Sequence, residues 1–482
     1  MSENQSIADA LDHINEYERE RVPESETKGF KDFLAMVAGE HIAGTEFVIG
    51  PLFVLHGASA TNLILGLLAG NILATLSWTL ICAPLAAKTR LTLFYQLEKI
   101  CGYKLVSIFN AISGLQACVF AAFMAVVSAG AISLVAGLPT PSFTEMVPQN
   151  PSWYLMITVV TGLITVIAIL GIDWVSRFAQ ISTPWLPWVF LAAGVATLPA
   201  LGVRSLSDFW QVANTKIWTG VAANGMQQYT FWHIMFFAWL ANTAMHIGLS
   251  DMFIYRYAKK SYYGLASIGG MFIGHFMAWI ASGILCAAAL QAGIKDPTPA
   301  QVAQIGAGLA GLICVVIAGW TTANPTLYRA GLAVQGILPN TKRWKITLWL
   351  GVGAAVMGFF PGIVSRLDAL LAIFALIAAP VGAVVLLDVY LFPRLGLQQN
   401  FSAANNGAFN GAAAATWVVS MVSCYFLYVW LEVDFFFFMA IPGWFIAAAL
   451  YVPLSWWMQR RTLTGTRVAD AGRVREPVNS HV

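Results

Sequence analysis

Long apolar runs occupy most of this chain, and they constrain its fold more than any other feature. A helix needs about twenty apolar residues to cross the hydrocarbon core of a bilayer. Twelve runs have about that length: 33–55, 62–85, 105–136, 154–172, 180–201, 230–250, 263–291, 303–324, 345–363, 367–392, 411–431 and 436–457. Because a segment in lipid must satisfy its own backbone hydrogen bonds, runs of this length form helices. We therefore predict an all-α integral membrane protein with about twelve transmembrane helices.

The composition excludes a soluble globular protein. Hydrophobic residues make up 58% of the chain and charged residues only 10%, against about 25% charged residues in an average soluble domain. The net charge of +3 reflects an excess on one side of the membrane, so it indicates no nucleic-acid partner. The expected partners are the lipid bilayer and a small molecule. The sequence leaves the oligomeric state open, and a monomer is compatible with it.

Lysine and arginine are distributed unevenly among the loops. If the N-terminus is cytoplasmic, the outside segments hold only four of the 26 basic residues, namely Arg204, Lys216, Lys295 and Arg366. Cytoplasmic loops carry the excess of basic residues in membrane proteins. We therefore predict a multi-pass protein of the plasma or inner membrane with both termini in the cytoplasm.

Two of the predicted spans contain residues that interrupt a helix. The first, 33–55, holds three glycines, a proline and three ionisable residues, and the sixth, 230–250, holds Asn242, His246 and Gly248. Interrupted spans at matching places in two halves indicate a transporter built from inverted repeats. Unwound backbone frees carbonyl groups for a cation and N–H groups for a polar substrate. Close helix packing is the alternative use of such glycines.

A polar run follows the apolar run 309–317 directly. Residues 318–329 read AGWTTANPTLYR, with a run of hydroxyls, an amide and a proline in what is expected to be the eighth span. In a bilayer core such groups are costly unless they line a cavity or bind something. The alternative interpretation is a proline kink between packed helices.

Four segments together resemble the nucleobase–cation symporter-1 family, which includes cytosine permease and hydantoin transporters. They are 320–332 in the eighth span, 86–92 (AAKTRLT), Asp251 with 255–257 (YRY), and 379–383 (APVGA) with Asp388 and Tyr390. The family usually has glycine where Arg90 stands in this sequence. The resemblance covers about residues 33–395, and its most specific part is the eighth span.

The resemblance implies the LeuT-like fold, in which two inverted five-helix repeats with broken helices 1 and 6 are followed by two peripheral helices. It divides the chain as follows: a cytoplasmic tail 1–30, a first repeat 31–202, a second repeat 229–395, two peripheral helices 411–457 and a cytoplasmic tail 458–482.

A sodium site is implied by the same resemblance. The family uses carbonyls of the broken first helix with a carbonyl and two hydroxyls of the eighth. Carried over by position, these are the backbone of Gly44, Phe47 and Ala318 and the hydroxyls of Thr321 and Thr322. Neutral oxygens of this kind suit a hard monovalent cation. Alternatively, both threonines hydrogen-bond to carbonyls of their own helix. We expect Na+ or H+ as the coupling ion and no other cofactor.

A substrate site is implied where the family stacks a planar heterocycle between aromatic residues of the third and sixth spans. The resemblance places Phe120 at the third-span position, and Gln116 lies one helical turn earlier on the same face, where an amide can read the edge of a ring. Trp239 and Asn242 are the sixth-span candidates, and Asn324 is the eighth-span candidate. Ordinary packing is the alternative role for Phe120.

Glu46 is an ionisable residue in the middle of the first span, which makes it a functional candidate. It could bind a cationic or N–H-rich substrate, carry a coupling proton or add charge near the cation; the alternative is a buried, structural carboxyl group. Glu40 and His41 lie closer to the cytoplasm, and we interpret them as a local pair.

These features predict a secondary active transporter and not an enzyme. The resemblance implies symport of a small planar nitrogen heterocycle, such as a nucleobase, a hydantoin, allantoin or a related vitamin precursor, with a cation by alternating access. The alternative is a proton-coupled carrier of a cationic or amine-bearing solute through Glu46. A haem protein or intramembrane enzyme is less favoured, because no known catalytic motif occurs in the sequence.

Overall fold

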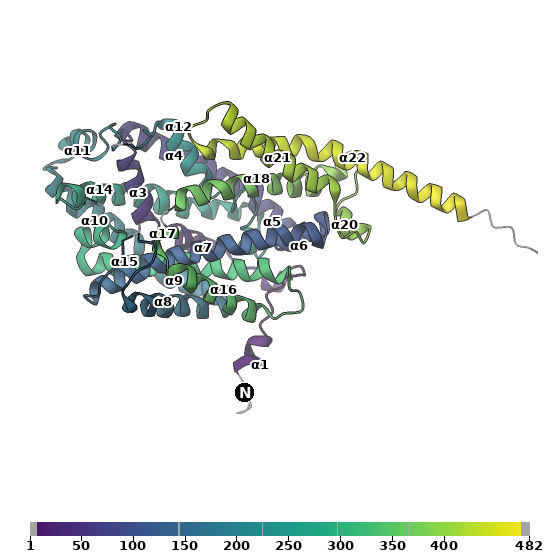
Figure 1. Ribbon diagram of the computed structural model, residues 1–482, viewed down its shortest axis with the longest axis horizontal. Coiled ribbons are helices and arrows are strands. Elements are labelled where there is room, and N and C mark those ends of the chain that lie inside the picture. The colour runs from purple at the N-terminus through teal and green to yellow at the C-terminus, as the bar shows by residue number, and fades with distance from the viewer. Residues whose placement is uncertain (1–6, 143–144, 224, 296, 365, 474–482) are drawn as a thin grey trace, which may run out of the picture.

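The structure is a computed structural model that describes residues 7–473 except 143, 144, 224, 296 and 365. Within these residues every regular element is a helix, and no β-strand is present. Figure 1 shows most helices running along the long axis of the molecule, with α11 at one end and α6, α20 and the projecting α22 at the other.

In the first half of the chain, the helices on either side of the break in the first span are short, and the helix of the third span is long. The elements of this half are α1 (Ile7–Asp12), η1 (Glu24–Glu26), α2 (Phe30–His41), α3 (Glu46–Leu55), α4 (Ala60–Ser77), the π-helical turn η2 (Trp78–Cys82), α5 (Ala83–Thr89), α6 (Leu93–Cys101), α7 (Tyr103–Val135), α8 (Pro151–Ile169), α9 (Ile172–Ser182), α10 (Leu186–Leu201), α11 (Leu206–Val212) and the π-helical turn η3 (Ala213–Ile217).

The second half repeats this pattern of one broken span followed by longer helices. Its elements are α12 (Phe231–Leu240), α13 (Met252–Tyr255), η4 (Ser261–Ala266), the π-helical segment η5 (Gly269–Phe276), α14 (Met277–Gln291), α15 (Pro299–Gln335), α16 (Arg343–Gly358), α17 (Pro361–Val364), α18 (Leu367–Tyr390), α19 (Phe392–Leu395), α20 (Phe401–Ala404), α21 (Gly411–Trp430), η6 (Phe436–Met439) and α22 (Ala440–Arg473).

The helices account for the predicted spans. Among the described residues, nine helices are long and apolar enough to cross a membrane, or ten if the bent pair α2 and α3 is one span. The other two predicted spans coincide with α12, a shorter apolar helix of 10 residues, and with α16, which has 16 residues. Helix α12 is short because the sixth span stops being helical after Leu240.

Both interrupted spans are broken where the sequence places glycine and polar residues. Helices α2 and α3 differ in direction by 51°, and residues 42–45 between them are not helical. In the sixth span, residues 241–251 form successive turns before α13. Leu249 in this stretch has a φ of +69°, a conformation that a helix cannot contain. The broken backbone therefore lies inside the bundle in both halves.

The packing of the helices is symmetric between the two halves. Helix α12 packs against α4, and in the corresponding places α2 and α3 pack against η5 and α14. Helix α7 packs along α15, and α8 packs against α16. Exchanging the first five spans with the second five reproduces each of these contacts, which is the pattern that inverted repeats produce. The exact boundaries of the two repeats remain a prediction.

Small residues permit the closest of these contacts. A Cβ atom on Gly50 of α3 would lie 2.0 Å from the Ser282 hydroxyl and 2.5 Å from the Trp279 carbonyl of α14. A Cβ atom on Gly319 of α15 would lie 2.2 Å from the Ser128 hydroxyl of α7. These glycines let the broken first span and α15 approach their neighbours at backbone distance.

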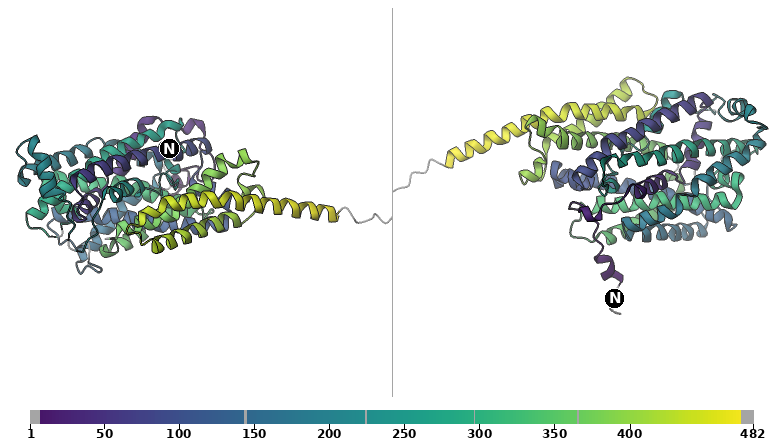
Figure 2. Two further views of the ribbon diagram at one scale, coloured as in Figure 1. Left: turned by 90° about the horizontal axis from the view of Figure 1, so that it is seen from above. Right: turned by 180° about the vertical axis from the view of Figure 1, so that it is seen from behind.

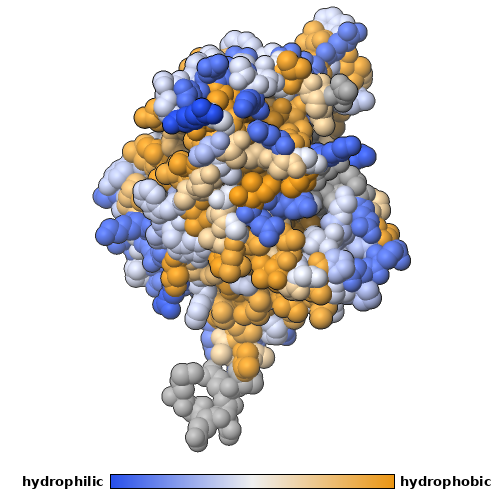
Figure 3. All heavy atoms as spheres, turned by 90° about the vertical axis from the view of Figure 1, so that its left-hand side faces the viewer, coloured by the Kyte–Doolittle hydropathy of each residue, from blue (hydrophilic) through white to orange (hydrophobic). Residues whose placement is uncertain are grey.

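Both ends of the described chain lie at one end of the bundle. In the N-terminal segment, the guanidinium of Arg19 pairs with Glu98 at 2.5 Å, and Gln96 near by donates to Asn400. Gln459 of α22 accepts a hydrogen bond from the backbone N–H of Gln398. Figure 2 shows α22 continuing beyond the bundle at this end. Figure 3 looks onto the opposite end, where hydrophilic and hydrophobic residues are interspersed.

Candidate functional site

A central cavity lies where the two broken spans meet. Its walls come from α2, α3 and the segment between them, the broken sixth span, α7, η5, α14, α15 and α18. Four of the residues predicted from the sequence line it, namely Glu46, Phe120, Asn242 and Thr322. The fold therefore brings residues from four separate spans to one place.

The cavity is closed around a small volume of about 30 Å³. A buried cavity that holds benzene measures about 150 Å³. This arrangement can therefore enclose a water molecule but not an aromatic ring. A ring could enter only after the surrounding helices move apart, so the conformation described here is a closed one.

Glu46 is the first residue of α3 and points its carboxyl group into this closed site. The side chain is 1% exposed. Its Oε1 atom accepts a hydrogen bond from the Thr45 hydroxyl at 3.2 Å and lies 4.0 Å from Nε2 of His275. Its Oε2 atom has no hydrogen-bond partner among the described residues. The N-terminus of α3 favours the negative charge, but in the described part of the chain no lysine or arginine forms an ion pair with it.

An aromatic wall stands beside Glu46. The His275 ring stacks on Trp279 with 4.2 Å between ring centroids, and the His41 ring meets His275 edge-on at 5.0 Å. The indole N–H of Trp279 and the side-chain NH₂ of Asn242 are buried without a hydrogen-bond partner in the described structure. Buried donors are normally paired, which makes these two donors candidates for hydrogen bonds to a ligand.

Oxygen atoms of α2 and α15 gather on another side of the cavity. The Thr322 hydroxyl lies 2.9 Å from the Glu40 carbonyl oxygen and 3.3 Å from the Ala318 carbonyl oxygen. The Thr321 hydroxyl donates to the same Ala318 carbonyl at 2.9 Å. The Glu40 carbonyl belongs to the last turn of α2, where carbonyls have no partner further along the helix. Two hydroxyls and two carbonyls thus form a cluster between the helices.

The first-span carbonyl at this cluster is that of Glu40, which was not among the predicted ligands. It accepts a hydrogen bond from the hydroxyl of Thr322 on α15. Of the predicted residues, Gly44 lies against Gly319, and the Phe47 ring stacks on Phe190 at 4.4 Å. Helix α2 ends at His41, which leaves the Glu40 carbonyl in its last turn free for this contact. Binding of a cation by the Gly44 and Phe47 carbonyls stays a prediction.

Three other predicted residues do not line the cavity. The Trp239 indole donates to the Ser77 hydroxyl at 3.0 Å, so it packs against α4. Gln116 is half-buried on α7 outside the lining. Asn324 is fully buried on α15, and both of its amide atoms lack a partner among the described residues. Sequence reasoning instead missed His275 and Trp279; their spacing of four residues on an apolar span, which puts both on one helix face, was the available signal.

A buried ion-pair cluster lies next to the oxygen cluster. Arg329 Nη1 of α15 lies 3.7 Å from a carboxylate oxygen of Glu40 and 3.7 Å from one of Asp251. The Trp78 indole donates to the other oxygen of Asp251 at 2.7 Å. Glu40 therefore contacts Arg329 through its side chain and Thr322 through its backbone. The local pair of Glu40 and His41 that we expected is not formed, since His41 Nδ1 contacts the Val37 carbonyl.

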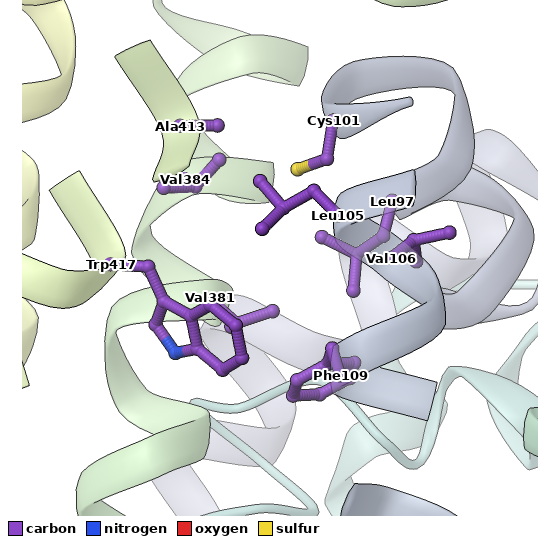
Figure 4. Close-up of a pocket in the computed structure, with 9 residues that line it drawn as sticks. All are labelled: Leu97, Cys101, Leu105, Val106, Phe109, Val381, Val384, Ala413 and Trp417. Carbon is purple, nitrogen blue, oxygen red and sulfur yellow. The ribbon is translucent and has the colours of Figure 1, made fainter. Parts of the chain in front are cut away.

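A second enclosed pocket has no such chemistry. Figure 4 shows it between α6, α7, α18 and α21, lined by Leu105, Phe109, Val384 and Trp417 among other apolar side chains. Its volume is about 20 Å³, and the Trp417 N–H is already bonded to the Ile377 carbonyl. It is a packing gap, and the central cavity is the better candidate for a binding site.

Comparison with known proteins identifies the fold. No family model and no curated protein sequence matches the chain. Among solved structures, Mhp1, a nucleobase–cation-symport-1 family transporter in a closed conformation with bromovinylhydantoin bound, matches with a TM-score of 0.72 and 15% identity, covering 93% of this chain and 96% of that one. An inward-facing conformation of Mhp1 matches with a TM-score of 0.67 and 15% identity over 92% and 93% of the chains.

A third structure extends the comparison to another transporter. A Na+-coupled sialic acid symporter in a substrate-bound, outward-open state matches with a TM-score of 0.63 and 14% identity, covering 91% of each chain. The chain is thus a multi-pass membrane protein with the LeuT-like transporter fold. The predicted resemblance to the nucleobase–cation symporter-1 family is confirmed at the level of the fold, through Mhp1.

Proposed function

We propose that this protein is a secondary active transporter that carries a small planar nitrogen heterocycle inward together with a cation. The observation that supports this most is the meeting of both broken spans at one closed polar cavity, directly beside the oxygen cluster of α2 and α15. Transporters with discontinuous helices place substrate and ion sites at such positions. The match to Mhp1 with bromovinylhydantoin bound supports a flat nitrogen ring as the cargo.

Sodium is the coupling ion that we propose for the oxygen cluster. The donor set consists of the Glu40 and Ala318 carbonyls and the Thr321 and Thr322 hydroxyls, all neutral, as a hard monovalent cation prefers. The oxygen atoms lie 2.9 to 3.3 Å apart, a spacing at which neighbouring ligands of one ion can sit. A cation bound there would hold α2 against α15. Each hydroxyl would then rotate its proton away from the carbonyl it contacts now.

Alternating access requires the helices around the cavity to separate on one side at a time. Helix α2 ends at the break, and its contacts with α15 include the Glu40 carbonyl on Thr322 and the Glu40 carboxylate on Arg329. Loss of the Thr322 and Arg329 contacts would free it to move. In this proposal both termini and Arg329 face the cytoplasm, so that movement of α2 opens the inner side.

The test is uptake into proteoliposomes by the purified protein. Imposing an inward Na+ gradient should drive accumulation of one member of a panel of nucleobases, hydantoins, allantoin and amino-substituted heterocycles. Thr322→Ala should abolish the sodium dependence. Thr326→Ala is the matched control, because Thr326 is buried one turn further along α15 and only bonds back to the Thr322 carbonyl. Absence of gradient-driven accumulation across the panel would refute the proposal.

A proton-coupled carrier remains the second candidate because of Glu46. Its buried carboxyl group has one oxygen without a partner among the described residues and lies 4.0 Å from His275, an arrangement that could hold a transported proton. Under this alternative, a proton gradient without sodium would drive uptake. Glu46→Gln would abolish that uptake, and Thr322→Ala would leave it unchanged.

A further inference from the structure

The two carboxyl groups of the central cavity are in opposite electrostatic situations. Glu40 shares Arg329 with Asp251 at 3.7 Å. Glu46 is equally buried, but its only ion-pair partner within 4.0 Å in the described structure is the His275 ring, which is charged only if protonated. An ionised carboxylate without a cationic partner is costly to bury. A cationic ligand beside Glu46 would remove that cost.

The hydrogen-bonding atoms around the cavity also restrict the shape of a ligand and its pattern of donors and acceptors. Glu46 Oε2 is a free acceptor, while the Asn242 NH₂ and the Trp279 N–H are free donors, each unpartnered in the described part of the chain. The stacked rings of His275 and Trp279 line the same cavity. A matching ligand is planar, donates hydrogen bonds at the edge facing Glu46 and accepts them at its other edges.

We infer that the substrate presents an amidinium-type edge to Glu46, that is, two N–H groups on one carbon that share a positive charge. This inference rests on the proposed function and narrows its substrate class to aromatic amidines and ring-protonated aminoheterocycles. Two parallel N–H groups match the two oxygens of a carboxylate, as in arginine–carboxylate pairs. The charge of the ligand also supplies the cation that Glu46 lacks.

A neutral lactam edge fits the same site poorly. Hydantoins and oxo-pyrimidines offer a carbonyl oxygen next to an N–H group. Against a carboxylate, the N–H would bond, but the carbonyl oxygen would face the second carboxylate oxygen without a proton between them. A glutamine at this position would instead match a lactam with one donor and one acceptor. The choice between glutamate and glutamine at position 46 therefore selects between the two kinds of ring edge.

Benzamidine and benzamide provide a test of this selection, because they are nearly identical in shape and differ in charge and in one group, an NH₂ of the amidinium in place of the carbonyl oxygen of the amide. Binding to the full-length protein in detergent with Na+ would be measured by titration of thermal stability. The unmodified protein should bind benzamidine at least about thirtyfold more tightly than benzamide, since loss of one partner of a buried charge pair costs about that much or more. Glu46→Gln should reverse the order.

Two further variants keep the result interpretable. Glu46→Asp retains the carboxylate and should retain the preference for benzamidine, even if both affinities fall. Glu98→Gln removes a carboxylate from the surface pair with Arg19 and should change neither affinity. If Glu46→Gln does not fold, the comparison is repeated on the unmodified protein with 2-aminopyridine as a second cation and 2-pyridone as a second neutral amide.

The outcomes separate this inference from the proposed function. Tighter binding of the neutral probe, benzamide or 2-pyridone, than of its cationic counterpart by the unmodified protein would overturn the inference, because Glu46 would then act as a protonated carboxyl group. The symporter proposal would stand. An unchanged preference in Glu46→Gln would overturn the inference as well. Tight benzamidine binding without gradient-driven uptake of any solute would instead refute the transport function and leave the recognition by Glu46 intact.

Discussion

Arg329 connects two buried carboxyl groups beside the central cavity. It is 6% exposed and is shared by Glu40 and Asp251, which are both buried. Removing the only cation from such a cluster leaves two carboxyl groups buried without compensation, which destabilises a protein by about 3–5 kcal/mol. We therefore predict that Arg329→Gln lowers the melting temperature in detergent strongly, as measured by fluorescence-detected unfolding.

Two controls define this effect. Arg204→Gln removes an arginine from an exposed position and should change the stability by less than about 0.5 kcal/mol. Adding Glu40→Gln and Asp251→Asn to Arg329→Gln removes the uncompensated charges and should recover part of the lost stability. A melting temperature of Arg329→Gln equal to that of Arg204→Gln would show that the cluster contributes nothing.

At the same scale, the sequence predicted the types of site residue better than their positions. Glu46, Phe120, Asn242 and Thr322 do line one cavity, because each lies on a span whose polar residues need an internal partner. Trp239 does not, since its helix turns it toward Ser77. Rotation of a helix about its axis follows from packing with its neighbours, which one sequence does not contain. The role of the four cavity residues in binding is still a prediction.

The packing of α3 against α14 depends on one glycine. A Cβ atom on Gly50 would overlap Ser282 and the backbone of Trp279 at 2.0 to 2.5 Å, and backbone cannot move aside cheaply. Gly50→Ala should therefore cost more than about 2 kcal/mol of stability. Gly162→Ala is the matched control, because Gly162 lies within α8 with open space around it and alanine there should be neutral or slightly stabilising. Equal melting temperatures for the two variants would contradict this packing argument.

Helix α2 borders a large cleft on the outside of the bundle. The cleft has a volume of about 500 Å³ and is lined by apolar residues of α2, α10 and η5, including Ala35, Trp188 and Phe272. If α2 moves during transport, this is space into which it can move. We predict that Ala35→Trp fills the cleft and slows uptake into proteoliposomes severalfold while ligand binding in detergent persists.

The control for this prediction is Ala415→Trp, a substitution at an exposed position of α21. It adds the same bulk to the apolar surface away from α2 and should leave uptake unchanged. Unaltered uptake by Ala35→Trp would show that α2 does not use the cleft.

The presence of breaks in the first and sixth spans was predictable, but the residues at which the helices end were not. Glycine and ionisable residues mark where a membrane helix is interrupted, and the structure has both breaks. Helix α2 ends at His41, and Gly39 in its last turn lies close to Thr183 and Thr321. Such contacts join residues far apart in the sequence, so local pattern alone does not reveal them.

For the molecule as a whole, orientation in the membrane is the property that links the fold to the direction of transport. The described termini lie at one end of the bundle, since Arg19, Gln96, Gln398 and Gln459 are connected there by successive contacts. The opposite end contains α11. Only four of the 26 basic residues fall in the segments assigned to the outside, so from the positive-inside rule we predict that the termini lie in the cytoplasm.

Single introduced cysteines would test this orientation. The six natural cysteines are all buried, so a membrane-impermeant maleimide should label them slowly in the folded protein. Ser207 on α11 and Ala404 on α20 are exposed at opposite ends. In intact cells Ser207→Cys should be labelled and Ala404→Cys should not, and permeabilisation should make Ala404→Cys reactive. The reverse pattern would place the Arg329 cluster on the outer side of the membrane. The movement of α2 would then open the cavity for binding of substrate from outside and not for its release into the cell.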